Sequence, residues 1–244
     1  MSKQKREASR RERVAEMQRD AASRERNRRL LITLAIVVVL SAAVAAFVVF
    51  SGGGTTKAPA ATSSAKASGQ ALVVGSNDKA KYKVVVYEDF LCPYCRQFET
   101  SSRDFLRAGA QKGTVQVEYR PFHLLQDSYS VRALSAWAAV LQHGTPEQAL
   151  RFHDTLYDNQ PYEQDPNKPD AAKLTTWAKD SGVTASAALD GIGRTDTSFV
   201  EAANASASQA GVSETPTVLV NGKEVSGSSI SAMVDNLERT VASG

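Results

Sequence analysis

Residues 89–99 read Asp-Phe-Leu-Cys-Pro-Tyr-Cys-Arg-Gln-Phe-Glu and contain the only two cysteines of this 244-residue chain, Cys92 and Cys95. The β-branched run 83–87 before them predicts a buried strand, and the residues from Cys95 onward predict a helix start. Cys92 would then lie at a helix N-terminus, where backbone N–H groups and the helix dipole favour the thiolate. Because the thiolate is the species that attacks disulfides, this stretch predicts thiol–disulfide exchange.

A zinc site and a purely structural disulfide are the alternatives for this cysteine pair. Zinc needs two further ligands, and the three histidines, His123, His143 and His153, do not show the paired spacing of a zinc motif. A disulfide across two residues closes a very small loop and adds little stability. Redox chemistry is therefore the favoured interpretation.

The segment Leu30–Phe50 consists of 21 uncharged, mostly apolar residues, and about 20 such residues span a bilayer as one helix. The head, residues 1–29, holds eleven basic and five acidic residues and so carries a net charge of +6. The positive-inside rule places this head in the cytoplasm and everything after Phe50 outside. The sequence thus predicts a single-pass cell-membrane protein with an extracytoplasmic catalytic domain, a compartment in which disulfides persist.

A cleaved signal peptide is the alternative to this anchor, but its apolar region is usually only about 7–15 residues long. An uncleaved signal anchor is therefore favoured. The basic head could in principle bind nucleic acid. Its interspersed acids and its position next to the span instead indicate a solvated helix near anionic lipid headgroups, so no nucleic-acid partner is expected.

Residues 51–70 contain no aromatic residue and no apolar period, and they predict a flexible tether. Residues 71–244 are long enough for one domain with a sizeable core. The expected strands are 71–74, 83–88, 115–120, 217–220 and 223–225. The expected helices are 93–111, 128–142, 145–157, 168–181, 196–210 and 229–241. A helical block is therefore inserted between the two halves of a sheet.

The chain resembles the DsbA-like branch of the thioredoxin superfamily from about Ala71 to its C-terminus. The resemblance rests on the Cys-Pro-Tyr-Cys turn with Phe98-Glu99 after it and on three further segments, 118–122, 152–161 and 214–222. It implies an α/β thioredoxin fold with a helical insertion at about 124–211, preceded here by a single transmembrane helix. The anchor and the Ala/Ser-rich tether are similar to those of membrane-anchored members from high-GC Gram-positive bacteria.

The resemblance also implies a substrate-binding element at Thr215-Pro216, which the family holds in the cis form beside the reactive disulfide. A cis-proline has no N–H, and it fixes the preceding backbone so that Thr215 can pair with an extended substrate. An ordinary trans proline at a strand start is the alternative, but the nearby cysteine pair favours cis. Pro93 and Tyr94 complete the expected substrate-binding residues.

The chain departs from the family pattern at two positions. Many members carry a buried proton-accepting acid six residues before the first cysteine, where this chain has Val86. Glu88 and Asp89 are the possible replacements for proton transfer, although Asp89 is expected at the exposed end of its strand. Strong oxidants of the family usually hold histidine between the cysteines. Tyr94 at that place predicts a less acidic Cys92 and a less oxidising disulfide.

The predicted function is the introduction of disulfide bonds into exported proteins, with Cys92 as nucleophile and Cys95 as resolving cysteine. The family implies reoxidation by a membrane partner of the DsbB or vitamin K epoxide reductase type. No metal or organic cofactor is expected besides the Cys92–Cys95 disulfide, and the expected state is a monomer. The alternatives are an extracytoplasmic disulfide reductase or isomerase, and a non-catalytic thioredoxin-fold binding or assembly module.

Overall fold

The computed structural model describes residues 65–75 and 79–242 of the chain. The predicted head and span, residues 1–29 and Leu30–Phe50, and most of the predicted tether lie outside the described residues. Within the described ranges, no helix is long and apolar enough to cross a membrane.

The centre of the molecule is a six-stranded sheet. Its strands are β1 (Ala65–Ser68), β2 (Ala71–Val74), β3 (Tyr82–Glu88), β4 (Val115–Pro121), β5 (Thr217–Val220) and β6 (Lys223–Glu224). They lie in the order β1-β2-β4-β3-β5-β6, with β3 and β4 parallel and all other neighbours antiparallel. The Val-rich β3 is central, which explains why it is apolar on both faces.

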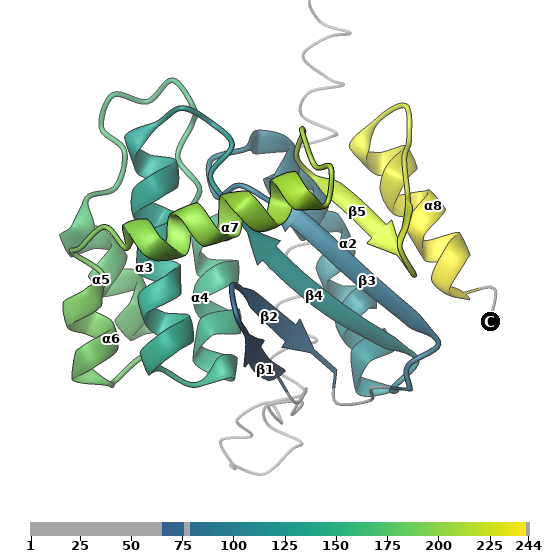
Figure 1. Ribbon diagram of the computed structural model, residues 1–244, viewed down its shortest axis with the longest axis horizontal. Coiled ribbons are helices and arrows are strands. Elements are labelled where there is room, and N and C mark those ends of the chain that lie inside the picture. The colour runs from purple at the N-terminus through teal and green to yellow at the C-terminus, as the bar shows by residue number, and fades with distance from the viewer. Residues whose placement is uncertain (1–64, 76–78, 243–244) are drawn as a thin grey trace, which may run out of the picture. The chain divides into compact units, whose positions relative to one another are not determined.

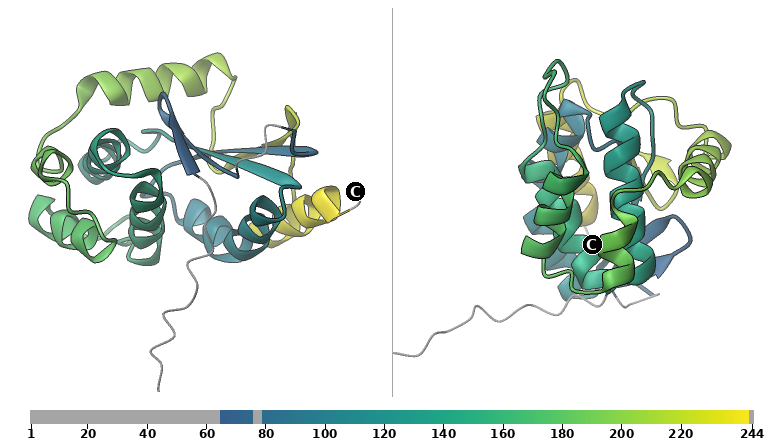
Figure 2. Two further views of the ribbon diagram at one scale, coloured as in Figure 1. Left: turned by 90° about the horizontal axis from the view of Figure 1, so that it is seen from below. Right: turned by 90° about the vertical axis from the view of Figure 1, so that its left-hand side faces the viewer.

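Helices cover both faces of this sheet (Figures 1 and 2). Helices α2 (Pro93–Gln111) and α8 (Ile230–Ala242) pack together on one face, and α7 (Thr197–Gln209) crosses the opposite face. Between β4 and α7 the chain forms the helical insertion, which lies beside the sheet. Its helices are α3 (Ser128–His143), α4 (Pro146–Asp158), α5 (Ala171–Asp180) and α6 (Ser186–Gly191).

Local sequence signals account for most of the element boundaries. Asp127, Asp170 and Asp196 accept hydrogen bonds from the first-turn N–H groups of α3, α5 and α7, and Thr145 begins α4 with a complete capping box. The predicted Asn221-Gly222 turn is also confirmed, since both residues have positive φ and join β5 to β6. Every predicted strand and helix over 71–241 is present, within three residues of its expected ends.

Two elements differ from the sequence prediction. Residues 65–68, expected to belong to the tether, form strand β1 along the edge of β2, with Gly69 in the turn at a φ of 59°. Helix α6 was not predicted at all. Neither segment has a strong local pattern: β1 is largely exposed and exists by pairing with β2, and α6 packs its buried Ala188 in the insertion.

Candidate active site

Cys92 is the N-cap residue of α2, directly after the loop that follows β3. Pro93 occupies the first turn, where its missing N–H costs no hydrogen bond. Both cysteines are free thiols in this structure. The pKa of Cys92 is lowered to about 6, first by a hydrogen bond from the Cys95 thiol and then by bonds from Thr215 and from backbone N–H groups at the helix start, which together outweigh its burial.

Cys95 is the third residue of α2 and is fully buried. Burial raises the pKa of its thiol well above the ordinary value, and the neighbouring Cys92 and the charge of Glu88 raise it further. The two sulfurs are therefore chemically unequal: Cys92 is poised as a thiolate, and Cys95 keeps its proton.

The loop before β5 lies against Cys92. The peptide bond Thr215–Pro216 is cis, as the sequence analysis predicted. The Sγ atom of Cys92 is 3.4 Å from the carbonyl oxygen of Thr215, to which the thiol donates. The predicted residues Thr215, Pro216 and Cys92 are thus brought together from segments 123 positions apart. Tyr94, in contrast, points its ring to solvent and is 62 % exposed.

Gln160 fixes the turn that carries Cys92, a role that sequence reasoning missed. Its side-chain Nε2 donates to the carbonyl oxygens of Phe90 and Cys92, both at 3.0 Å, from a buried position just after α4. Two loop carbonyls are satisfied by one amide, so the turn is held rigidly against the insertion. The only sequence signal was the Asn-Gln-Pro run after a helix, which says nothing about the partner.

Asp89 is buried, so the expectation of an exposed strand end was wrong. One carboxylate oxygen accepts from the N–H of Leu91 at 2.8 Å. The other accepts from the N–H groups of Leu124 and Leu125 at 2.9 Å each and from the Ser130 hydroxyl at 2.7 Å. Four donors converge on this side chain because it joins the active-site loop to the start of the helical insertion. It functions as a structural acceptor.

Asp89→Asn is therefore expected to lower the free energy of unfolding by about 2 kcal/mol, because asparagine has one accepting oxygen instead of two and at least one of the four converging donors loses its acceptor. Chemical denaturation at pH 7 measures this loss. Asp104→Asn, on the exposed side of α2, is the matched control and should change stability by less than about 0.5 kcal/mol. Equal stabilities of the two variants would show that Asp89 does not organise the loop.

Glu88 forms a buried ion pair with His153 of α4. Glu88 Oε1 lies 2.7 Å from His153 Nε2, and both side chains are fully buried. The imidazole is enclosed by the rings of Phe90, Tyr119 and Tyr157. Burial alone lowers the pKa of His153, but the charge of Glu88 and hydrogen bonds to Asp154 and Glu88 outweigh it and raise the pKa to about 10.

The position of Glu88 explains the departure at Val86. Alternate residues of a strand face the same side, so Glu88 lies on the same face of β3 as Val86, the site of the acid in the family. The buried acid is thus present on the expected face, two residues later. Sequence reasoning named Glu88 but gave His153 no role.

Three buried ionisable side chains, Glu88, Glu99 and His153, form a cluster near the active-site helix. Glu88, Glu99 and His153 place ligand-type atoms within 4.8 Å of one another. Glu88 and His153 are already paired by a hydrogen bond. The positive charge of Arg103 favours the carboxylate form of the third residue, Glu99. These residues fit a proton-sharing cluster.

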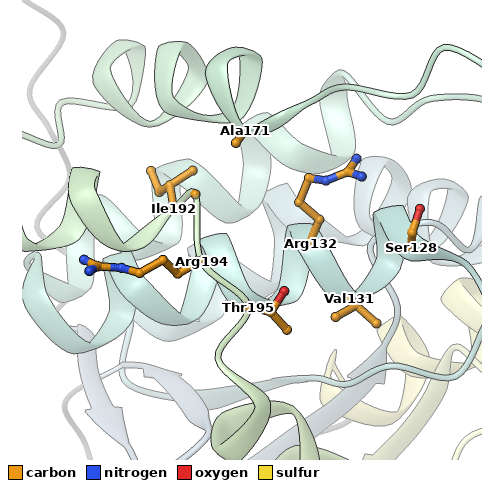
Figure 3. A pocket seen from close by; sticks show the side chains of 8 residues that line it. Ser128, Val131, Arg132, Ala171, Ile192, Arg194 and Thr195 are labelled. Carbon is orange, nitrogen blue, oxygen red and sulfur yellow. The ribbon is translucent and has the colours of Figure 1, made fainter.

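A pocket of about 360 Å³ in the helical insertion contains none of the predicted site residues (Figure 3). It lies between α3, α5 and the segment after α6, and Arg132 and Arg194 on its wall point in different directions. Neither a cysteine nor an acid lines it.

Comparison with known proteins shows which family this chain is similar to. The family model described as thioredoxin matches residues 67–239. The disulfide bond oxidoreductase DsbG from Mycobacterium tuberculosis, in its reduced form, is 33 % identical. That alignment covers 66 % of this chain and 78 % of DsbG, with a TM-score of 0.57. Reduced DsbA from the same organism is 32 % identical over 71 % of this chain and 93 % of DsbA, with a TM-score of 0.59.

A more distant structure supports the fold alone. The thiol-disulfide oxidoreductase MdbA from Corynebacterium diphtheriae is 24 % identical over 70 % of this chain and 91 % of MdbA, with a TM-score of 0.59. The comparison with curated protein sequences gives no match. The family model covers well over half of this chain, and the alignment with DsbA spans nearly all of that protein. This chain therefore belongs to the DsbA-like branch of the thioredoxin superfamily.

Proposed function

We propose that this protein is a thiol–disulfide oxidoreductase that introduces disulfide bonds into exported proteins through Cys92 and Cys95. The observation that carries the proposal is the inequality of the two thiols. Cys92, at the helix start beside the cis-proline loop, has a pKa of about 6, whereas fully buried Cys95 retains its proton. The names of the two mycobacterial structures, DsbG and DsbA, support the same class of chemistry.

The reaction begins with the Cys92–Cys95 disulfide. A substrate thiolate attacks Cys92 Sγ, a substrate–Cys92 disulfide forms, and the bonding electron pair leaves on Cys95. A second substrate thiolate then attacks the substrate sulfur of this mixed disulfide, and Cys92 leaves as a thiolate. The substrate is oxidised and the enzyme reduced by two electrons, so no cofactor beyond the two sulfurs is used. The low pKa of Cys92 makes it a good leaving group.

The substrate is expected to lie across Cys92 in an extended form. On one side, Thr215 and Pro216 offer backbone to pair with it. Pro93 and the exposed Tyr162 line a hollow of about 260 Å³, and the ring of Tyr94, two residues after Cys92, is also exposed. Exposed aromatic rings beside a reactive sulfur suit unfolded chains, which present apolar side chains.

Oxidation is favoured over reduction because a stabilised thiolate favours the reduced enzyme and makes its disulfide more oxidising. The Cys92 pKa of about 6 lies between about 7 for thioredoxin, a reductant, and about 3.5 for DsbA, a strong oxidant. This intermediate value agrees with neutral Tyr94 replacing histidine. A moderately oxidising disulfide is the expected result.

The reduction potential of the Cys92–Cys95 pair tests the direction. The full chain in detergent is equilibrated with glutathione buffers, and the fraction of disulfide is measured by alkylation. A value between about −180 and −120 mV, in the range of protein oxidants, would support disulfide formation. A value below about −230 mV approaches thioredoxin and would indicate a reductase. A pair that does not cycle at all would indicate a non-catalytic binding module.

We further propose that Leu30–Phe50 anchors the domain outside the cell membrane and that a membrane partner of the DsbB or vitamin K epoxide reductase type reoxidises Cys92 and Cys95. The apolar span and the basic head support this topology. Alkaline phosphatase fused after Phe50 should be active, because that enzyme needs disulfides formed outside the cytoplasm. An inactive fusion would place the domain inside.

A further inference from the structure

Helix α2 begins without a conventional cap. Its N-cap residue is Cys92, whose side chain makes no capping hydrogen bond of ordinary geometry. The N–H groups of Tyr94 and Cys95 nevertheless act on the Cys92 sulfur, in the place where an N-cap oxygen usually accepts. In the proposed reaction this sulfur is attacked and later leaves, so it cannot also hold the helix start in position. Another group has to fix the geometry of the turn.

The reactivity of Cys92 depends on that geometry. Hydrogen bonds lower the pKa of its thiol, first from the Cys95 thiol and then from Thr215 and the N–H groups of Cys95 and Tyr94, while burial opposes them. Cys95 is the titratable side chain that acts on it directly. Hydrogen bonds weaken steeply when their angle or length changes. A small rotation of the turn would therefore make the Cys92 thiolate less stable.

Gln160 holds two carbonyl groups of this turn. Its Nε2 donates to the carbonyl oxygens of Phe90 and Cys92 at 3.0 Å each. Only the NH₂ end of the amide can donate to two carbonyl groups, so these contacts also fix which way the amide points. The bond to the Cys92 carbonyl holds the peptide plane before Pro93 and with it the Cys92 ψ angle of 117°. That angle sets how the sulfur faces the first turn of α2.

The end of α4 anchors Gln160. The Gln160 N–H donates to the carbonyl oxygen of Tyr157 at 3.3 Å, and the residue is only 9 % exposed. Two arginines of α2 bind the preceding turn of α4. Arg103 pairs with the Asp158 carboxylate at 2.9 Å, and Arg96 donates to the Asp158 carbonyl oxygen at 3.4 Å. Gln160 is therefore a support that is itself held against α2.

We propose that Gln160 is the positioning residue of Cys92, an inference that rests on the proposed redox function. By holding the carbonyl groups of Phe90 and Cys92, its amide keeps the first-turn N–H groups of α2 and the Cys95 thiol directed at the Cys92 sulfur. The support acts on the backbone, so it does not depend on whether the sulfur is a thiolate or part of a disulfide. Through this one side chain the helical insertion sets the reactivity of the redox pair.

Gln160→Met tests this role, because methionine keeps the length and the neutrality of glutamine but has no N–H to donate. The readout is the ionisation of Cys92 in the reduced full chain, followed by the ultraviolet absorbance of the thiolate. Wild type should show one transition near pH 6. Gln160→Met should move this transition upward by about one pH unit. Cys92→Ser should lack it.

The equilibrium with glutathione gives a second readout. A higher Cys92 pKa removes stabilisation from the reduced enzyme, so the Gln160→Met disulfide should be less oxidising. For a shift of about one unit, the equilibrium should move toward the disulfide about fivefold at pH 7 and hardly at all at about pH 5, where Cys92 is mostly protonated in both proteins. Both proteins share the same buffers, so the ionisation of glutathione cancels. Loss of stability alone would not produce this pH dependence.

Gln111→Met is the matched control, because Gln111 is exposed at the opposite end of α2. It should reproduce the wild-type transition and the wild-type equilibrium. Gln160→Glu is a second test variant, since it keeps the shape of the side chain but places an oxygen where the amide NH₂ donates to the two carbonyl groups. It should shift the Cys92 transition in the same direction as Gln160→Met.

A folded Gln160→Met or Gln160→Glu protein with the wild-type transition and equilibrium would overturn the proposal while leaving the redox function intact. So would a wild-type transition near pH 9, the ordinary value for a thiol, since the turn would then confer no acidity for Gln160 to maintain. A wild-type pair that does not exchange with glutathione would instead overturn the proposed function itself. The failures of the two proposals are thus distinguishable.

Discussion

Cys92→Ser is expected to reduce oxidation of a dithiol peptide to the uncatalysed rate, a loss of at least about 10³-fold. The remaining sulfur, Cys95, cannot take over, because it is fully buried and its pKa is raised well above the ordinary value. A serine hydroxyl also has no accessible anion near neutral pH. The measurement is peptide oxidation by the pre-oxidised full chain in single-turnover conditions.

Cys95→Ser is the matched control for this result. It keeps the Cys92 nucleophile and removes only the resolving sulfur, so it should accumulate a stable mixed disulfide with thiol-bearing proteins. Cys92→Ser should form none. Trapping by Cys92→Ser, or oxidation that survives it, would contradict the assignment of Cys92 as the attacking and attacked sulfur.

His153→Leu is expected to lower the free energy of unfolding at pH 7 by about 3–5 kcal/mol, because removing one partner leaves Glu88 buried without its counter-charge. This loss is a large share of the about 5–15 kcal/mol that stabilises a typical domain. Chemical denaturation of both proteins measures it. His143→Leu, at an exposed position near the end of α3, is the control and should stay within about 0.5 kcal/mol of wild type.

The pH dependence of this stability has a defined sign. The folded-state pKa of His153 is about 10, above the unfolded value of about 6.5. Its stabilisation is therefore complete below pH 6.5 and is lost as pH rises toward 10. The difference between wild type and His153→Leu should shrink over the same interval. A difference that stays constant up to pH 10 would contradict a charged His153.

The double variant Glu88→Leu with His153→Leu separates the ion pair from simple packing. Replacing both partners by apolar side chains removes the unpaired charge, so the double variant should recover much of the stability lost by His153→Leu alone. Additive losses would show that the two residues do not interact energetically.

Local sequence patterns were sufficient for most of the secondary structure. The β-branched run before Cys92, the proline at the start of α2, the Thr145 capping box and the Asn221-Gly222 turn each act within a few residues, so their consequences are visible in the chain itself. Strand β1 has no such pattern. It forms because β2 offers an edge to pair with, and that edge exists only after folding.

The sequence by itself determined the reactive pair Cys92 and Cys95, because a strand-to-helix turn with two cysteines is a local signal. Its resemblance to the DsbA-like branch added the thioredoxin fold and the cis form of Thr215–Pro216. Only the tertiary structure decided which groups serve that pair. It buried Asp89, brought His153 to Glu88 across 65 positions and Gln160 to Cys92 across 68. It also buried the Glu99 carboxyl group without a hydrogen-bond partner among the described residues. Whether a distant acid is buried, paired or protonated depends on the packing of β3, α2 and α4 against one another, which no single segment encodes.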